Sequence, residues 1–174
     1  MTTKAPPDTL GIIAGNGVYP RLLADAARKA GVNKIIAAAF ANETDPVLPQ
    51  HVDVIEWMRV GQLNRLLKFF NEHKVHHGIM AGQIAPKNLF DLRPAVKALL
   101  LLGKLKQRNA ESIFAAIADE LAKIGVDLLP ATTFLEESLA SVGLITGAKL
   151  SRREEEDVGF GPGEAAHCIA AGGR

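Results

Sequence analysis

Short apolar segments alternate with amphipathic segments along most of the chain. Between the apolar segments, hydrophobic residues recur at the spacing of a helix with one buried side. Strands and helices that alternate in this way are typical of a parallel sheet with right-handed crossovers. We therefore predict an α/β fold, a Rossmann-like parallel sheet of about five strands with helices on both faces. The predicted strands are 9–14, 33–40, 52–58, 75–81 and 126–131, and the predicted helices are 20–30, 60–74, 92–105 and 111–124.

The same pattern divides the chain into segments. Residues 1–8 are polar and proline-rich, and we expect them to form a loose leader. Residues 9–160 hold all the predicted strands and helices, and we expect one Rossmann-like domain there. Residues 161–174 are rich in alanine and glycine and have neither helical nor strand periodicity, so we expect an irregular tail.

Composition narrows the class of protein. The 174 residues are 48% hydrophobic and 22% charged, as in ordinary globular domains. A formal net charge of +1 argues against broad binding of nucleic acid, which needs a basic surface. The single cysteine, Cys168, cannot form an internal disulfide, and the polar start is unlike a secretion signal. Apolar runs such as 98–102 are far too short to span a bilayer. We expect a cytoplasmic protein, and peripheral association with the inner face of the membrane stays open.

The first candidate site is the turn Gly15-Asn16-Gly17, between the first predicted strand and helix. Three interpretations compete: a tight turn without a ligand, a dinucleotide site, and a site for a phosphate or a nucleotide sugar. The dinucleotide fingerprint is incomplete, because Pro20 replaces its third glycine and no acidic residue directly follows the second strand. Pro20 is well tolerated in a first helical turn, whose N–H groups favour an anion. Arg21 adds positive charge there.

Further loops are expected at the same edge of the sheet, because the carboxyl ends of parallel strands lie together. Gln83 follows the fourth strand and offers a donor and an acceptor for a base or a sugar. Lys87 and Arg93 either meet a phosphate or are solvated. Hydroxyls at Thr132 and Thr133 either contact phosphate or cap the next helix. The ligand-binding candidates are Gly15, Asn16, Gly17, Pro20, Gly61, Gln62, Gly82, Gln83 and Thr132.

No metal ligands or catalytic residues emerge from the sequence. His76 and His77 are neighbours in a strand, so they point to opposite faces and do not easily hold one ion. His51 and His73 have no partners at ligand spacing. The acidic pair at 136–137 is expected to face solvent on a short helix.

Four motifs in order and spacing resemble the LpxI-type UDP-2,3-diacylglucosamine pyrophosphatases, over roughly residues 9–160. They are "GIIAGNGVYPRLL", "RVGQLNRLLKFF", "GIMAGQIAPKNLFDLRP" and "VDLLPATTFLEESL". The resemblance implies a lipid A biosynthesis enzyme that hydrolyses UDP-2,3-diacylglucosamine to UMP and 2,3-diacylglucosamine 1-phosphate with Mg²⁺. It also implies a Rossmann-like N-terminal domain and a C-terminal domain with the ligand between them. The family pattern carries over to Gly15, Gly17, Pro20, Gly61, Gln62, Gly82 and Gln83, and less firmly to Thr132.

Two departures from the family pattern affect what we expect of activity. Many members carry Gly-Asp-Asp where this chain has Arg108-Asn109-Ala110, which removes two carboxylates. After Gly161 the chain does not continue as the family does. A reading-frame shift or a natural short form would produce such a change. We therefore expect a substrate-binding half with little turnover by itself, whose partner is a C-terminal domain or a second copy. A non-catalytic nucleotide or sugar-phosphate module and a nicotinamide-dependent oxidoreductase are the alternatives.

Overall fold

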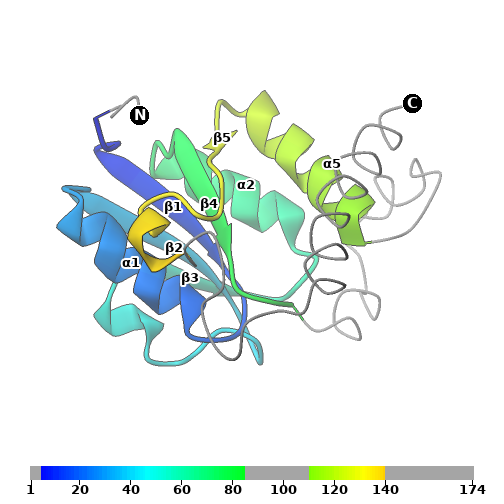
Figure 1. Cartoon of the computed structure of the whole chain (residues 1–174). Helices are drawn as coiled ribbons and strands as arrows, with labels where there is room; N and C mark the ends of the chain where they lie inside the picture. Colours follow the sequence, from blue (N-terminus) through cyan, green and yellow to red (C-terminus); the bar gives the residue numbers. More distant parts are fainter. Residues whose placement is uncertain (1–4, 85–109, 140–174) are drawn as a thin grey trace, which may run out of the picture. The chain divides into compact units, whose positions relative to one another are not determined.

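The computed structural model describes residues 5–84 and 110–139 (Figure 1). All of them except Leu139 belong to one compact unit, Met1–Ser138. The strands are β1 (Thr9–Ala14), β2 (Lys34–Phe40), β3 (Val54–Met58), β4 (His77–Ala81) and β5 (Asp127–Leu128). The helices are α1 (Tyr19–Lys29), α2 (Leu63–Glu72) and α5 (Ala110–Lys123), with short 3₁₀ turns at Leu48–Gln50 and Glu136–Ser138. The helix predicted at 92–105 and the tail at 161–174 lie outside the described residues.

The strands form one sheet in the order β3-β2-β1-β4-β5, and every neighbouring pair is parallel. This confirms the predicted Rossmann-like sheet. Ala14 at the end of β1 lies opposite both Ala39 of β2 and Ala81 of β4, so three strands end at the same level. Strand β5 is only two residues long, shorter than predicted. The N–H of Leu129 still donates to Gly78, but Pro130 has no N–H with which to extend the pairing.

Helices cover both faces of this sheet, as predicted. On one face α1 packs through Leu23, Ala24 and Ala27 against residues such as Leu10 and Ile12. The alternation of side chains along a strand sends Ile13 to the other face.

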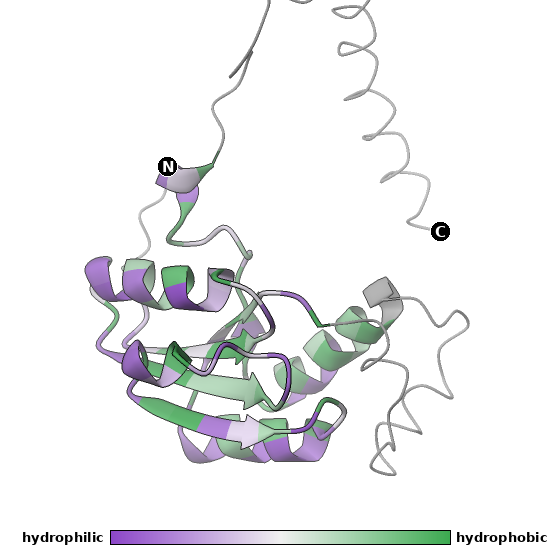
Figure 2. Cartoon of the chain, turned by 90° about the horizontal axis from the view of Figure 1, so that it is seen from below, coloured by the Kyte–Doolittle hydropathy of each residue, from purple (hydrophilic) through white to green (hydrophobic). Residues whose placement is uncertain are grey.

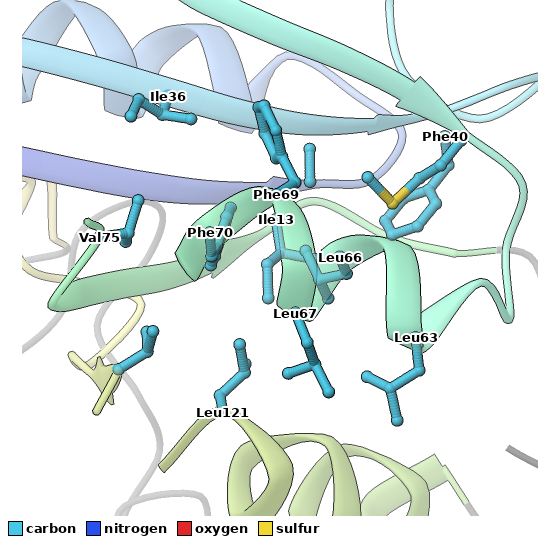
Figure 3. Close-up of a cluster of buried hydrophobic side chains, with 13 residues drawn as sticks. Ile13, Ile36, Phe40, Leu63, Leu66, Leu67, Phe69, Phe70, Val75 and Leu121 are labelled. Carbon is cyan, nitrogen blue, oxygen red and sulfur yellow. The ribbon is translucent and has the colours of Figure 1, made fainter. Parts of the chain in front are cut away.

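On that other face α2 and α5 lie next to each other and bury side chains in one cluster (Figure 3). Phe70 of α2 is fully buried there, and Leu121 brings α5 into the same cluster. Gly11 makes room for this packing, because a Cβ at that position would stand 2.9 Å from the Phe70 ring. Figure 2 shows that the helices turn their polar sides away from the sheet.

The helix ends follow local chemistry. Pro20 occupies the first turn of α1, and Gly31 follows its last turn with φ of 100°, as a helix-ending glycine does. Helix α2 begins at Leu63, later than the predicted start at residue 60, because Gly61 has φ of 89° and Gln62 is not helical. Among the described residues, the helices are too short or too polar to cross a membrane.

Candidate functional site

The sheet order creates a switch point between β1 and β4. From β1 the chain proceeds to β2 and β3 on one side, and from β4 it proceeds to β5 on the other. In open α/β sheets, ligands bind beyond the carboxyl ends of the two strands at which the order reverses. The loops that follow β1 and β4 therefore define the candidate site, and both were singled out from the sequence.

Those two loops are joined by backbone hydrogen bonds. The N–H of Gly15 donates to the carbonyl of Ala81 at 2.7 Å, which extends the β1–β4 pairing by one bond. Asn16 and Gln83 then form an antiparallel bridge. The Asn16 N–H donates to the Gln83 carbonyl at 2.6 Å, and the Gln83 N–H donates to the Asn16 carbonyl at 3.1 Å. The hydrogen-bonded backbone of these two loops therefore forms the base of the candidate site.

The glycines around this bridge serve two different purposes. A Cβ at Gly15 would stand 2.6 Å from the Gln83 carbonyl oxygen, and one at Gly82 would stand 2.5 Å from the Asn16 carbonyl oxygen. These glycines are required for the loops to touch. Gly17 has φ of 96°, and a Cβ there would meet no atom within 4 Å. Since the N–H groups of Gly15 and Asn16 are used within the fold, the backbone open to a phosphate begins at Gly17.

The start of α1 continues this open backbone. Val18 is the N-cap, no side chain caps the helix, and no acidic residue lies in the first turn. The N–H of Leu22 makes the first intrahelical bond, to the carbonyl of Val18. Earlier N–H groups of a helix have no helical partner, and with the helix dipole they favour an anion. Half-buried Arg21 lies in the same turn. The contact with phosphate stays a prediction. The open backbone at Gly17 suits such a contact.

The loop after β5 returns to the start of α1 (Figure 1). The Tyr19 hydroxyl donates to the carbonyl of Ala131, and Phe134 and Leu135 pack against the core cluster on the α1 side. Exposed Thr132 is thereby held near the first turn of α1. Sequence reasoning missed Tyr19, because its partner lies 112 residues further along the chain.

The loop after β2 contributes buried polar groups. The Thr44 hydroxyl accepts from the Phe40 N–H at 2.8 Å and donates to the Ala14 carbonyl at 2.5 Å, which ties the ends of β2 and β1 together. Glu43 beside it is only 5% exposed. Sequence analysis found no acidic residue directly after the second strand, and it did not anticipate that both side chains are buried at this edge.

The loop after β3 lies further away. Its strand is two positions from β1 in the sheet, which corresponds to about 10 Å at the usual strand spacing. The Gln62 side chain accepts from the Arg59 N–H at 2.8 Å, and Gly61 supplies the positive φ of the same turn. Both residues therefore shape the start of α2, and their predicted contact with ligand stays a prediction.

A comparison with protein families identifies the family of this chain. The LpxI N-terminal domain matches residues 9–138. The chain belongs to this family. The match covers all five strands and the loops described above, and it ends with the compact unit at residue 138. The LpxI family is one of lipid A biosynthesis enzymes. No curated protein matches the chain. The expected extension of the LpxI-type domain to residue 160 stays a prediction.

The remaining candidates of this LpxI-type chain are histidines and one acidic pair. His76 is exposed and His77 half-buried at the amino end of β4, and His51 Nδ1 lies 2.7 Å from a carboxylate oxygen of Asp25. The acidic pair at 136–137 is exposed, as predicted. Within residues 5–84 and 110–139, no three His, Cys, Asp or Glu side chains are arranged to hold a metal ion. The candidates outside the described residues are Lys87, Arg93, Arg108, Asn109 and Cys168.

Proposed function

We propose that the carboxyl edge between β1 and β4 binds UDP-2,3-diacylglucosamine. In this proposal the chain contributes the nucleotide-sugar site of a pyrophosphatase that releases UMP and 2,3-diacylglucosamine 1-phosphate. The observation that carries the proposal is the open turn at Gly17, which leads into an uncapped helix start at the switch point. Membership in the LpxI family supports the choice of substrate.

The diphosphate is the part of this ligand that the start of α1 suits. Its negative charge matches unpaired N–H groups and the positive end of the helix dipole. The positive φ of Gly17 lets the backbone approach without a side chain in between. Arg21 adds a positive charge in the same turn. Gln83, exposed beside this turn, is placed to orient the nucleotide or the sugar.

Hydrolysis adds water across the pyrophosphate and breaks one bond to the bridging oxygen. In this proposal the described residues supply binding groups for the substrate. They include no group of three His, Cys, Asp or Glu side chains arranged to hold a metal ion, and we assign no step to the metal. We further propose a cytoplasmic location at the inner face of the membrane, where the acyl chains of the substrate would partition.

The binding site is tested with Gly17→Val and a matched control, Gly125→Val. Both glycines have positive φ, 96° and 80°, and neither would bring a Cβ within 4 Å of another atom, but Gly125 lies at the opposite edge of the sheet. Both variants should lose similar stability, since a branched residue resists positive φ. Only Gly17→Val should weaken UMP binding in calorimetry. Equal affinity in the two folded variants would remove the turn from the site.

The reaction is tested by incubating the 174-residue chain with UDP-2,3-diacylglucosamine, with Mg²⁺ and with EDTA. We expect UMP to bind while its release from the substrate stays slow, because residues 5–84 and 110–139 offer no group of three His, Cys, Asp or Glu side chains to hold the metal. Binding without any turnover, with or without Mg²⁺, would favour the non-catalytic module. Tighter binding of NAD than of UMP would favour the oxidoreductase.

A further inference from the structure

The Asn16–Gln83 bridge forms the base of the candidate site, and it also sets the positions of two side-chain amides. The two residues exchange both backbone hydrogen bonds, so they are a hydrogen-bonded pair of an antiparallel ladder. Residues directly opposite each other in such a ladder project their side chains from the same face, with Cβ atoms about 4.5–5.5 Å apart. Both residues are exposed. Two primary amides therefore stand side by side at the switch point.

The backbone holds these two amides in a defined register. Strands β1 and β4 are parallel, but the bridge is antiparallel, so one segment must reverse direction before it. Gly82, with φ of 87°, allows that reversal. Gly15 and Gly82 let the two loops approach to a distance that any Cβ would prevent. The side chains thus project from a rigid base.

Each carboxamide has an acceptor oxygen and a donor NH₂ group. A phosphate accepts hydrogen bonds only, so it would use the donors and leave both amide oxygens unmatched. A group with an N–H next to a C=O uses a donor and an acceptor of the pair together. We propose that Asn16 and Gln83 act as one unit that binds an amide or imide group of the ligand. This rests on the proposed function, because UDP-2,3-diacylglucosamine carries two such groups, the uracil imide and the 2-acylamide of the sugar.

The test measures binding to the full chain by calorimetry with three probes. UMP carries the imide, N-acetylglucosamine 1-phosphate carries the acylamide, and inorganic phosphate carries neither. The variants are Asn16→Ala, Gln83→Ala and the double variant. The control is Asn71→Ala, which removes an exposed amide from the far end of α2. Circular dichroism confirms that each variant is folded.

We expect each single variant to weaken binding of one of the two amide-bearing probes about tenfold, the scale of a lost hydrogen bond to a ligand. The double variant should be weakened by much less than the product of the two effects, because the residues act on one group. Phosphate binding and the Asn71→Ala control should not change. If UMP is the probe affected, the variants should also lose the preference for UMP over CMP, which lacks the imide N–H.

The outcomes separate this proposal from the proposed function. An effect on UMP identifies the uracil, and an effect on N-acetylglucosamine 1-phosphate identifies the acylamide; either supports the pair. If the wild-type chain binds both probes tightly and every variant retains that affinity, the proposed role of the two amides is overturned. The proposed function then still stands. If the double variant weakens binding by the full product of the two single effects, the two residues act independently, and the proposed joint role is also overturned. A wild-type chain that binds neither probe overturns the proposed function, and the role of the pair with it.

Discussion

The amino edge of the sheet and the switch point at its carboxyl edge use their polar groups differently. At the amino edge they pair with one another: Asp53 accepts from the Ile35 N–H at 2.7 Å and from Arg28 at 2.5 Å, and Asn33 donates to Asp8 at 2.7 Å. At the carboxyl edge the backbone is paired, but the amides of Asn16 and Gln83 have no side-chain hydrogen bond to any residue in 5–84 or 110–139.

This difference shows how one sheet separates stability from binding. Polar side chains that pair within the fold stabilise it, and a ligand would have to break those pairs before it could use them. Side chains held by a paired backbone need no such rearrangement. This contrast supports the proposal that the ligand binds at the switch point, and the following experiments test it.

The largest effect is expected for Gly82→Ala, compared with Gly31→Ala at the amino edge. Both glycines have positive φ, which costs a non-glycine residue about 1–2 kcal/mol. At Gly31 the nearest atom would be 3.6 Å from a new Cβ, but at Gly82 the Asn16 carbonyl oxygen would be 2.5 Å away. Gly82→Ala should therefore lose about 2–5 kcal/mol of unfolding free energy in urea.

The same pair of variants also sharpens the contrast in binding. Only Gly82→Ala should weaken UMP binding, since only its backbone shift displaces Asn16 and Gln83. Equal losses of stability in both variants would mean that the close contact between the two loops is not needed.

The next effect is expected at the buried tie between the ends of β2 and β1. Thr44→Val keeps the shape of the side chain but leaves the Phe40 N–H and the Ala14 carbonyl without their partner. We expect a loss of about 1–3 kcal/mol in thermal or urea unfolding. Thr132→Val, at an exposed position, should change stability by less than about 0.5 kcal/mol. If Thr44→Val also changes stability by less than about 0.5 kcal/mol, the Thr44 hydroxyl is not needed to hold the two strand ends together.

A smaller effect is expected for Tyr19→Phe. The change removes one hydrogen bond to the exposed Ala131, which contributes about 0.5–1.5 kcal/mol. Hydrogen exchange should accelerate in residues 131–135, whereas exchange in β2 should remain unchanged. Unchanged exchange in both segments would mean that apolar packing of Phe134 and Leu135 alone holds the loop.

The smallest effect is expected at the amino edge. Partial burial raises the pKa of Asp53, but the hydrogen bond from Ile35 and the Arg28 guanidinium outweigh it and lower that pKa below its ordinary value. The resulting stability is present above the unfolded-state pKa of about 3.9 and is lost as pH falls through the lower folded-state pKa.

Asp53→Asn should therefore cost less than about 1 kcal/mol at pH 7, and the difference from wild type should shrink as pH falls below about 4. Urea unfolding at a series of pH values measures this, with Asp127→Asn on β5 as an exposed control. UMP affinity should not change in either variant. A loss of affinity in Asp53→Asn would contradict the division of roles between the two edges.

The sequence by itself determined the architecture. Apolar runs and helical periodicity predicted all five strands and the helices α1, α2 and α5, because each element must bury its own face and its pattern is local. Pro20 and Gly31 marked the limits of α1 for the same local reason. Four motifs, within a resemblance over roughly residues 9–160, indicated the family whose N-terminal domain then matched residues 9–138.

Only the tertiary structure decided which groups remain available at the site. The Asn16–Gln83 bridge, the tie from Tyr19 to Ala131 and the burial of Glu43 all depend on residues that approach through the order of the strands. Gly15 and Gly17 look alike in the sequence, yet one packs against another loop and the other is open. A local pattern cannot distinguish them, because the atoms that surround each glycine come from distant parts of the chain.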